Sequence, residues 1–193
     1  MVIKTREKLI DVARQLFAHK GIENTTMNDI ATASDKGRRT IYTYFKNKRE
    51  IYNAVIERES EQLVSRLREV VNMEIPPVEK LEKFLLLRFE IIKDAIVRHD
   101  SLLSFFTWDL RRVDRIRRLA SAKEDEILNA ILVDGVKQGV FRAEQAKMAP
   151  TLINTLMQGV DFLFFRDNPD GVDVNKEQTR DYTVKFIING IKQ

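Results

Sequence analysis

The sequence contains no cysteine and only two histidines, His19 and His99. Without cysteine the chain forms no disulfide and offers no thiolate to zinc or to an iron–sulfur cluster. The sequence also lacks the H-E-x-x-H pair of metalloproteases, the G-x-S-x-G turn of hydrolases and the phosphate-binding P-loop. We therefore expect a protein that is not an enzyme and that holds no metal and no cofactor. An acid–base pair among the many carboxylates is the alternative that this leaves open.

Long apolar runs are absent as well. Runs such as Phe162–Phe165 are far shorter than the ~20 residues that a membrane-spanning helix needs. The first residues lack the apolar region of a secretory signal. Hydrophobic residues nevertheless make up 44% of the chain, which is enough for a well-packed interior. We expect a soluble protein without membrane contact, located in the cytoplasm, whose reducing conditions fit the lack of cysteine.

The chain shows no sustained alternation of apolar and polar residues and no internal repeat, so β-structure is not expected. Apolar residues instead recur at spacings of three and four, which is typical of helices packed on one face. These patterns predict an all-α protein of about nine helices, and Pro150 predicts a kink or a helix start near that point. The predicted helices span residues 4–20, 27–33, 38–45, 48–71, 78–99, 101–110, 112–138, 143–166 and 175–192.

Local residues mark where the first helices begin and end. Gly21 ends the first helix, because glycine tolerates a positive φ. Thr26 caps the second helix, with Asp29 three residues later in an arrangement close to a capping box. Residues 34–37 form a four-residue turn, and Asn47 caps the fourth helix.

The positive charge of the chain lies almost entirely in its first quarter. Residues 1–50 hold 11 Lys and Arg against 6 Asp and Glu, whereas residues 51–193 hold 22 against 23. Residues 36–49 contain six basic side chains and no acid. Such a run is often only a solvated face, but it also suits a surface that attracts the phosphates of nucleic acid. The structural context of the run decides between the two.

Two short helices joined by a four-residue turn form a helix-turn-helix, whose second helix fits the major groove of DNA. Ile41 and Phe45 of that helix are expected in the core, so its other side chains face outward. Arginine can pair with guanine through two parallel donors, and hydroxyl groups suit phosphate oxygens. The alternative for single residues is that the tyrosines pack inward and the arginines are only solvated. The expected DNA-binding residues are Thr26, Lys36, Gly37, Arg38, Arg39, Thr40, Tyr42, Thr43, Tyr44, Lys46 and Lys48.

Residues 26–31 (Thr-Met-Asn-Asp-Ile-Ala) and 40–48 (Thr-Ile-Tyr-Thr-Tyr-Phe-Lys-Asn-Lys) resemble the DNA-binding domain of the TetR family of bacterial transcriptional regulators. Caps, core positions and contact positions agree with the family over about residues 5–52. The turn departs from the family pattern. Lys36 stands where a small hydrophobic residue is usual, Gly37 where a Ser or Thr cap is usual, and Arg39 where glycine is frequent.

The resemblance implies an N-terminal helix-turn-helix DNA-binding domain, residues 1–50, joined by a long helix to a C-terminal helical bundle for dimerisation and ligand binding, residues 51–193. It implies a homodimer that binds a palindromic operator in double-stranded DNA. We expect a sequence-specific transcriptional regulator, a repressor that an unknown small-molecule effector releases. The alternative is a ligand-independent DNA-binding protein or an activator of the same fold.

The C-terminal half is rich in bulky apolar side chains, which line small-molecule pockets but also build ordinary cores. A few polar groups among them would orient a ligand. For His99, which stands beside Asp100 at a predicted helix end, a role at the helix dipole is the alternative. The expected ligand-binding residues are Phe84, His99, Phe105, Trp108, Asn154, Met157, Asp161 and Phe162.

Overall fold

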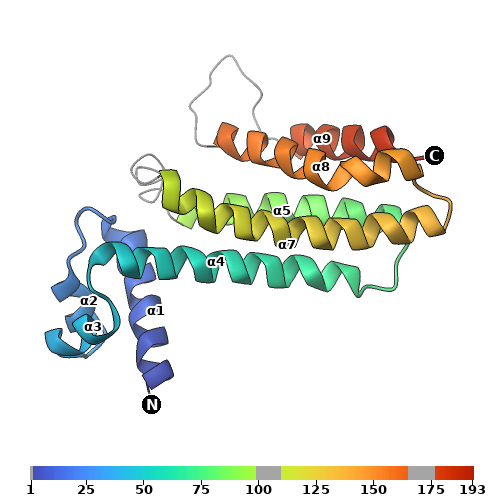
Figure 1. Ribbon diagram of the computed structural model, residues 1–193. Coiled ribbons are helices and arrows are strands. Elements are labelled where there is room, and N and C mark those ends of the chain that lie inside the picture. Colours follow the sequence, from blue (N-terminus) through green and yellow to red (C-terminus); the bar gives the residue numbers. More distant parts are fainter. Residues whose placement is uncertain (1, 99–109, 165–176) are drawn as a thin grey trace. The chain divides into compact units, whose positions relative to one another are not determined.

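The computed structural model describes residues 2–98, 110–164 and 177–193 (Figure 1). These residues are helical almost throughout, and a single isolated bridge is their only pairing of extended backbone. The predicted all-α fold is confirmed, whereas the predicted helix at 101–110 lies almost wholly outside the described ranges. The helices are α1 (Val2–Lys20), α2 (Met27–Ala33), α3 (Arg38–Tyr44), α4 (Lys48–Val71), α5 (Pro77–Arg98), α7 (Leu110–Lys137), α8 (Ala143–Phe164) and α9 (Glu177–Ile191).

The ends of the first helices follow the local signals in the sequence. α1 ends before Gly21, whose φ of 80° lies in the left-handed region that glycine adopts freely. Asn47 caps α4, because its Oδ1 accepts a 3.0 Å hydrogen bond from the N–H of Glu50. α8 continues through Pro150, so no helix starts at that proline.

Thr26 and Asp29 form a complete capping box at the start of α2. The N–H of Asp29 donates to Thr26 Oγ1 at 3.1 Å, and the N–H of Thr26 donates to Asp29 Oδ2 at 2.8 Å. The Thr26 hydroxyl donates to the same carboxylate oxygen at 2.9 Å. The bond from the Thr26 backbone, followed by that from its hydroxyl, holds the pKa of Asp29 below its ordinary value. The Asp29 side chain therefore accepts the N–H of the N-cap residue, a role that glutamate usually has in a capping box.

The described residues form two compact units, and the boundary between them falls inside α4. The first unit comprises Met1–Glu61 and Ala95–Arg117, and the second comprises Gln62–Asp94 and Arg118–Gln193. α4 therefore supplies its first residues to one unit and its last residues to the other. The assignment of separate functions to residues 1–50 and 51–193 stays a prediction.

In the first unit, apolar side chains from α1, α2, α3 and the start of α4 form one core. Phe17 and Tyr52 meet edge to face within it, with their ring centroids 6.2 Å apart. The burial of Ile41 and Phe45 in this core confirms the prediction for these two side chains. Other members of the core are Leu9, Ile10, Ala13, Ile22, Ile30, Ala31, Ile51, Ala54 and Val55.

Charged side chains of α1 and α4 pair on the surface of the first unit. Nη1 of Arg58 lies 3.0 Å from a carboxylate oxygen of Asp11 and 3.3 Å from one of Glu7. Nη1 of Arg14 donates to Oε1 of Glu59 at 3.2 Å. Pairs of this kind contribute at most about 1 kcal/mol each. These pairs link the side chains of α1 to those of α4 around the shared core.

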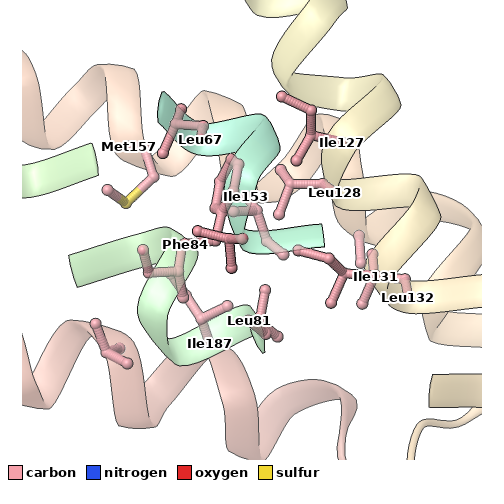
Figure 2. Packing of buried hydrophobic residues seen from close by; sticks show 14 of the residues in the cluster. Leu67, Leu81, Phe84, Ile127, Leu128, Ile131, Leu132, Ile153, Met157 and Ile187 are labelled. Carbon is pink, nitrogen blue, oxygen red and sulfur yellow. The ribbon is translucent and has the colours of Figure 1, made fainter. Parts of the chain in front are cut away.

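In the second unit, apolar side chains from α4, α5, α7, α8 and α9 point into one shared core (Figure 2). Each of these helices thus buries one apolar face within the unit. In the part of the chain that the structure describes, no helix combines the length and the apolar character that crossing a membrane requires. The labelled core residues are Leu67, Leu81, Phe84, Ile127, Leu128, Ile131, Leu132, Ile153, Met157 and Ile187.

One ion pair is buried beside this apolar core. Nε of Arg88, on α5, donates to Oε2 of Glu124, on α7, at 2.6 Å, and the two side chains are only 4% and 7% exposed. Taking two charges out of water is costly, and loss of either partner would leave the other charge buried without its counter-ion. The pair therefore favours one register of α5 against α7.

The C-terminal residues are bonded to the turn between α7 and α8. The N–H of Arg142 donates to the carbonyl of Ile191 at 3.0 Å, and the N–H of Gln193 donates to the carbonyl of Val140 at 3.0 Å. These two bonds flank the isolated bridge between residues 141 and 192. The end of the chain is thereby fixed to the start of α8.

Gly135→Ala is expected to destabilise the protein by about 1–3 kcal/mol, the usual cost of overpacking a core. A Cβ at this buried position would lie 2.1 Å from Cδ2 of Phe141, which is itself buried. Urea denaturation measures the difference. Gly159→Ala is the matched control, because its Cβ would meet nothing within 4 Å, and we expect it to be neutral or stabilising. Equal stability of the two variants would contradict the prediction.

Asp29→Asn is expected to lower the melting temperature at pH 7, because asparagine keeps an acceptor but loses the charge at the start of α2. The folded-state pKa of Asp29 is depressed, so its contribution is present above the ordinary pKa and is lost as the pH falls through the folded-state pKa. The difference from wild type should therefore shrink below about pH 4. Melting curves from pH 3 to pH 7 test this. The exposed Glu23, changed to Gln, is the control, and a difference that stays constant with pH would refute the role of the charge.

Candidate DNA-binding surface

The turn between α2 and α3 closes α2 in a Schellman motif. The N–H of Asp35 donates to the carbonyl of Thr32 at 3.0 Å, and the N–H of Lys36 donates to that of Ala31 at 2.9 Å. Asp35, with φ 55°, occupies the left-handed position that glycine usually takes. Gly37 instead has φ −65° and caps α3 without a side-chain bond. The position of this turn that usually requires glycine is therefore occupied by Asp35, and Gly37 has a backbone conformation that any residue can adopt.

α3 is held to the protein by one face and leaves the other face free. Ile41 is fully buried, and Phe45, directly after the helix, is 3% exposed. None of the eleven residues expected to bind DNA is buried. The exposed ones are Thr26, Gly37, Arg38, Arg39, Tyr42, Thr43 and Lys46, and the half-buried ones are Lys36, Thr40, Tyr44 and Lys48.

The two tyrosines of α3 differ in their surroundings. Tyr42 is 44% exposed, and the guanidinium carbon of Arg38 lies 5.9 Å from its ring centroid. This cation–π contact orients the arginine along the outer face of the helix. Tyr44 is half-buried and packs against the core of the first unit. The interpretation that the tyrosines pack inward therefore fits Tyr44 and does not fit Tyr42.

Several of the expected DNA contacts also make internal hydrogen bonds. The Thr26 hydroxyl belongs to the capping box of α2. Thr43 Oγ1 donates to the carbonyl one turn earlier in α3 at 3.0 Å. Lys48 Nζ donates to the carbonyls of Ile22 and Glu23 at 2.5 and 3.2 Å. The side chain of Lys46, in contrast, is exposed just after α3.

Two buried hydroxyl groups support this surface and were not singled out from the sequence. Thr25 is fully buried, and its Oγ1 donates to the carbonyl of Gly21 at 2.7 Å. Ser34 is also fully buried, and its hydroxyl donates to the carbonyl of Ala31 at 2.9 Å. Both residues stand next to a predicted helix end, where small hydroxyl side chains commonly bond to the backbone. Their position next to a helix end is the feature of the sequence from which these two hydroxyl groups could have been predicted.

The residues expected to bind a ligand lie partly outside the described structure. Phe84 and Met157 are buried in the apolar core of the second unit. Asn154 is buried too, and its Nδ2 donates to Asp125 Oδ1 and to the carbonyl of Ser121. His99, Phe105 and Trp108 lie outside the described residues, as do the side chains of Asp161 and Phe162 in α8.

A groove of about 650 Å³ lies along α8 and α9. Met148, Leu152 and Leu156 follow one another at four-residue spacing on α8, and all three are exposed. Phe186, on α9, is 74% exposed. Large exposed apolar side chains gathered in this way are typical of interaction surfaces. The groove is lined by Glu144, Gln145, Met148, Ala149, Leu152, Ile153, Leu156, Phe186, Ile187, Asn189, Gly190 and Ile191.

Known proteins share both the motif and the fold. Residues 9–55, which include α2, the turn and α3, match the model for bacterial regulatory proteins of the tetR family. The chain is 23% identical over 199 residues to the HTH-type transcriptional repressor KstR2 of Mycolicibacterium smegmatis. The aligned region covers 97% of this chain and 91% of that protein. It is 32% identical over 102 residues to the probable acrEF/envCD operon repressor of Escherichia coli K12, over 52% of this chain and 46% of that protein.

The whole fold is also found among solved structures. A transcriptional regulator from Cytophaga hutchinsonii superposes with a TM-score of 0.79 at 22% sequence identity, over 97% of this chain and 98% of that one. The helix-turn-helix, its exposed α3 and the family match agree with one another. Residues 9–55 carry the DNA-binding region of the tetR family of bacterial regulatory proteins, and the chain is a DNA-binding transcriptional regulator.

Proposed function

We propose that this regulator is a cytoplasmic repressor without enzymatic activity, which binds a palindromic operator as a homodimer and leaves it when a small molecule binds. The observation that carries the proposal is the division of α3 into a buried face, with Ile41 and Phe45, and an exposed polar face. A helix held in this way can enter a major groove with its outer side chains free. The repressors among its relatives support the sign of regulation.

The exposed residues of α3 divide into two proposed roles. Arg38 and Arg39 begin the helix, and the first residues of a recognition helix are those that contact base edges. Tyr42, Thr43 and Lys46 offer hydroxyl and ammonium groups that suit phosphate oxygens. Base contacts set the preferred sequence, whereas phosphate contacts set the affinity for any sequence.

The exposed apolar surface of α8 and α9 is proposed as the dimer interface. The stripe Met148, Leu152 and Leu156 lies beside Phe186 around the groove, and Tyr182 is exposed one turn before Phe186. A second copy of the same surface would cover these side chains, because a two-fold interface pairs one patch with itself. Two α3 helices would then be presented to two half-sites of one duplex.

The second unit is proposed to hold the effector. The Oδ1 of Asn154 is buried and has no hydrogen-bond partner among the described residues. A buried acceptor without a partner is costly, so an effector with an N–H or O–H donor would gain by binding there. Release from DNA follows if the effector prefers a conformation that does not fit the operator.

Selection of bound duplexes from a random pool, with the full chain, tests the proposal. We expect a two-fold symmetric motif whose half-sites are about one helical turn, or a multiple of it, apart. A motif without symmetry would contradict the dimeric operator. Enrichment of no sequence would contradict sequence-specific recognition itself.

The selected duplex then serves to test the effector. Small molecules that raise the melting temperature of the protein in the absence of DNA bind its folded state. If the protein is a repressor that an effector releases from DNA, these molecules must also weaken its binding to the selected duplex. Binders that leave the operator affinity unchanged would favour the ligand-independent alternative, and transcription that rises with bound protein would favour an activator.

Arg39→Ala is expected to relax the base preference at one position of each half-site, by about 1–3 kcal/mol of discrimination. Its affinity for random duplexes should change little. Lys46→Met is the comparison variant, and we expect it to weaken binding to all sequences and to flatten the salt dependence. Fluorescence titrations on the selected duplex and on its single-base variants measure both effects. An equal weakening on all duplexes for the two variants would refute this division of roles.

Phe186→Glu is expected to convert the dimer into monomers, because the carboxylate would have to be buried without a partner in the interface. The fold of the monomer should survive, since Phe186 is 74% exposed within one chain. Sedimentation velocity measures the mass of the species in solution. Val133→Glu is the matched control, because Val133 is also an exposed apolar residue, 42% accessible on α7, and does not line the groove. A Phe186→Glu protein that stays dimeric would show that the interface lies elsewhere.

A further inference from the structure

One basic side chain outside residues 36–49 reaches the end of α3. Arg6 lies in the second turn of α1, and its guanidinium carbon is 5.5 Å from the ring centroid of Phe45. Phe45 directly follows α3 and is 3% exposed, whereas the side chain of Arg6 is 44% exposed. The first helix of the unit thus places a cation over the ring whose burial anchors α3.

The contact with Phe45 does not use the hydrogen-bond donors of Arg6. The face of an aromatic ring attracts a cation, and a guanidinium group that lies over a ring keeps the N–H donors at its edge. Nη1 of Arg6 also lies 3.3 Å from Oε1 of Glu7, in a pair that is exposed to solvent. Such exposed pairs are weak, so a phosphate can replace the carboxylate. The ring therefore orients the arginine and leaves it able to bind an anion.

The charges around Arg6 favour an anion from outside the protein. The Glu7 carboxylate is shared, because Nη1 of Arg58 lies 3.3 Å from its other oxygen. Lys46, two residues after α3, is exposed. The next acid along the chain, Glu50, accepts the backbone N–H of Lys46 through Oε2 at 2.8 Å. Both acids are thus held by internal partners, and the cations of Arg6 and Lys46 are exposed near the end of α3.

We infer that Arg6 is a further DNA contact, which binds a backbone phosphate near the one that Lys46 binds. The surface that meets DNA then extends from α3 to the start of α1, and Phe45 holds the arginine in place. Phosphate contacts position a protein on the duplex and carry no sequence information, so Arg6 sets the affinity and not the base preference. The inference rests on the proposed entry of α3 into a major groove, and it depends neither on the effector nor on the dimer interface.

The test compares Arg6→Met with Lys8→Met in the full chain, by titrating each with the selected duplex over a series of salt concentrations. Methionine packs well against an aromatic ring but has no charge. Lys8 is the matched control, because it is also exposed on α1 and two residues along a helix lie about 200° apart around its axis. When a phosphate contact is lost, the slope of log affinity against log salt becomes shallower by about 0.9.

We expect the shallower slope for Arg6→Met, with an affinity reduced by about tenfold, the effect of removing one charge-assisted hydrogen bond. The reduction should be the same on the selected duplex and on random duplexes, because a phosphate carries no sequence information. Lys8→Met should keep the slope of the wild type. Arg6→Lys keeps the cation, so it should restore most of the slope.

An Arg6→Met protein with the affinity and slope of the wild type overturns the inference, because Arg6 then only covers Phe45. Equal changes of slope in Arg6→Met and Lys8→Met also overturn it. A lower melting temperature with unchanged DNA affinity, measured where circular dichroism shows the variant to be folded, makes its role one of stability alone. If Arg39→Ala and Lys46→Met change binding as expected and Arg6→Met does not, this inference alone fails. No effect of all three also refutes the proposed use of α3.

Neutral phosphates in the duplex locate the contact. A methylphosphonate replaces one charged phosphate at a time in the selected duplex, and the affinities of the wild type and of Arg6→Met are measured for each. We expect a position at which the neutral group weakens binding of the wild type by about tenfold and has no further effect on Arg6→Met, because both changes remove the same contact. For Lys46→Met the insensitive position should be a different one. If every position that is sensitive in the wild type stays sensitive in Arg6→Met, the inference is overturned.

Discussion

The helix α3 exists because Ile41 within it and Phe45 directly after it are buried. α3 has only seven residues, and isolated helices shorter than about 12–15 residues are marginal in water. Its stability must come from packing, and that packing is the burial of Ile41 and Phe45 in the core of the first unit. The same two contacts that form the helix therefore select which of its faces meets solvent. The proposed contacts of Arg38 and Arg39 with DNA depend first on this constraint, because it decides that both arginines face solvent.

Much of the first unit could be predicted because its signals are local. Caps such as Thr26 and Asn47, a helix end at Gly21 and an apolar period of three to four residues each act within one or two turns of chain. Lys48 was predicted to bind DNA, but its bonds to carbonyls 25 and 26 positions away could not be read from its neighbours. The positive φ of Asp35 in the turn could not be predicted for another reason. Asp35 takes a conformation for which the nearby glycine is the usual candidate.

The second unit shows where apolar pattern alone is ambiguous. An apolar side chain can serve a core, a pocket or an interface, and composition does not separate the three. Phe84 and Met157 lie in the core, although the sequence also suited them to a pocket. α8 carries apolar residues on two faces, with Ile153 inward and Leu152 outward. A helix that is apolar on more than one side needs a second partner, and this signal in the sequence could have indicated the groove.

The distribution of charge follows from how the first unit is assembled. Five of its acidic side chains are occupied internally: Glu7 and Asp11 bind Arg58, Glu59 binds Arg14, Asp29 closes the capping box, and the Glu50 carboxylate accepts the N–H of residue 46. The basic side chains at 36–49, apart from the half-buried lysines, extend into solvent with no acid among them. Acids that stabilise helix starts and helix pairing are thus kept in place by their partners, and the surface around α3 keeps a positive excess. Because long-range attraction by phosphates acts before any base is read, the packing that makes the unit stable also determines which side of it approaches the duplex.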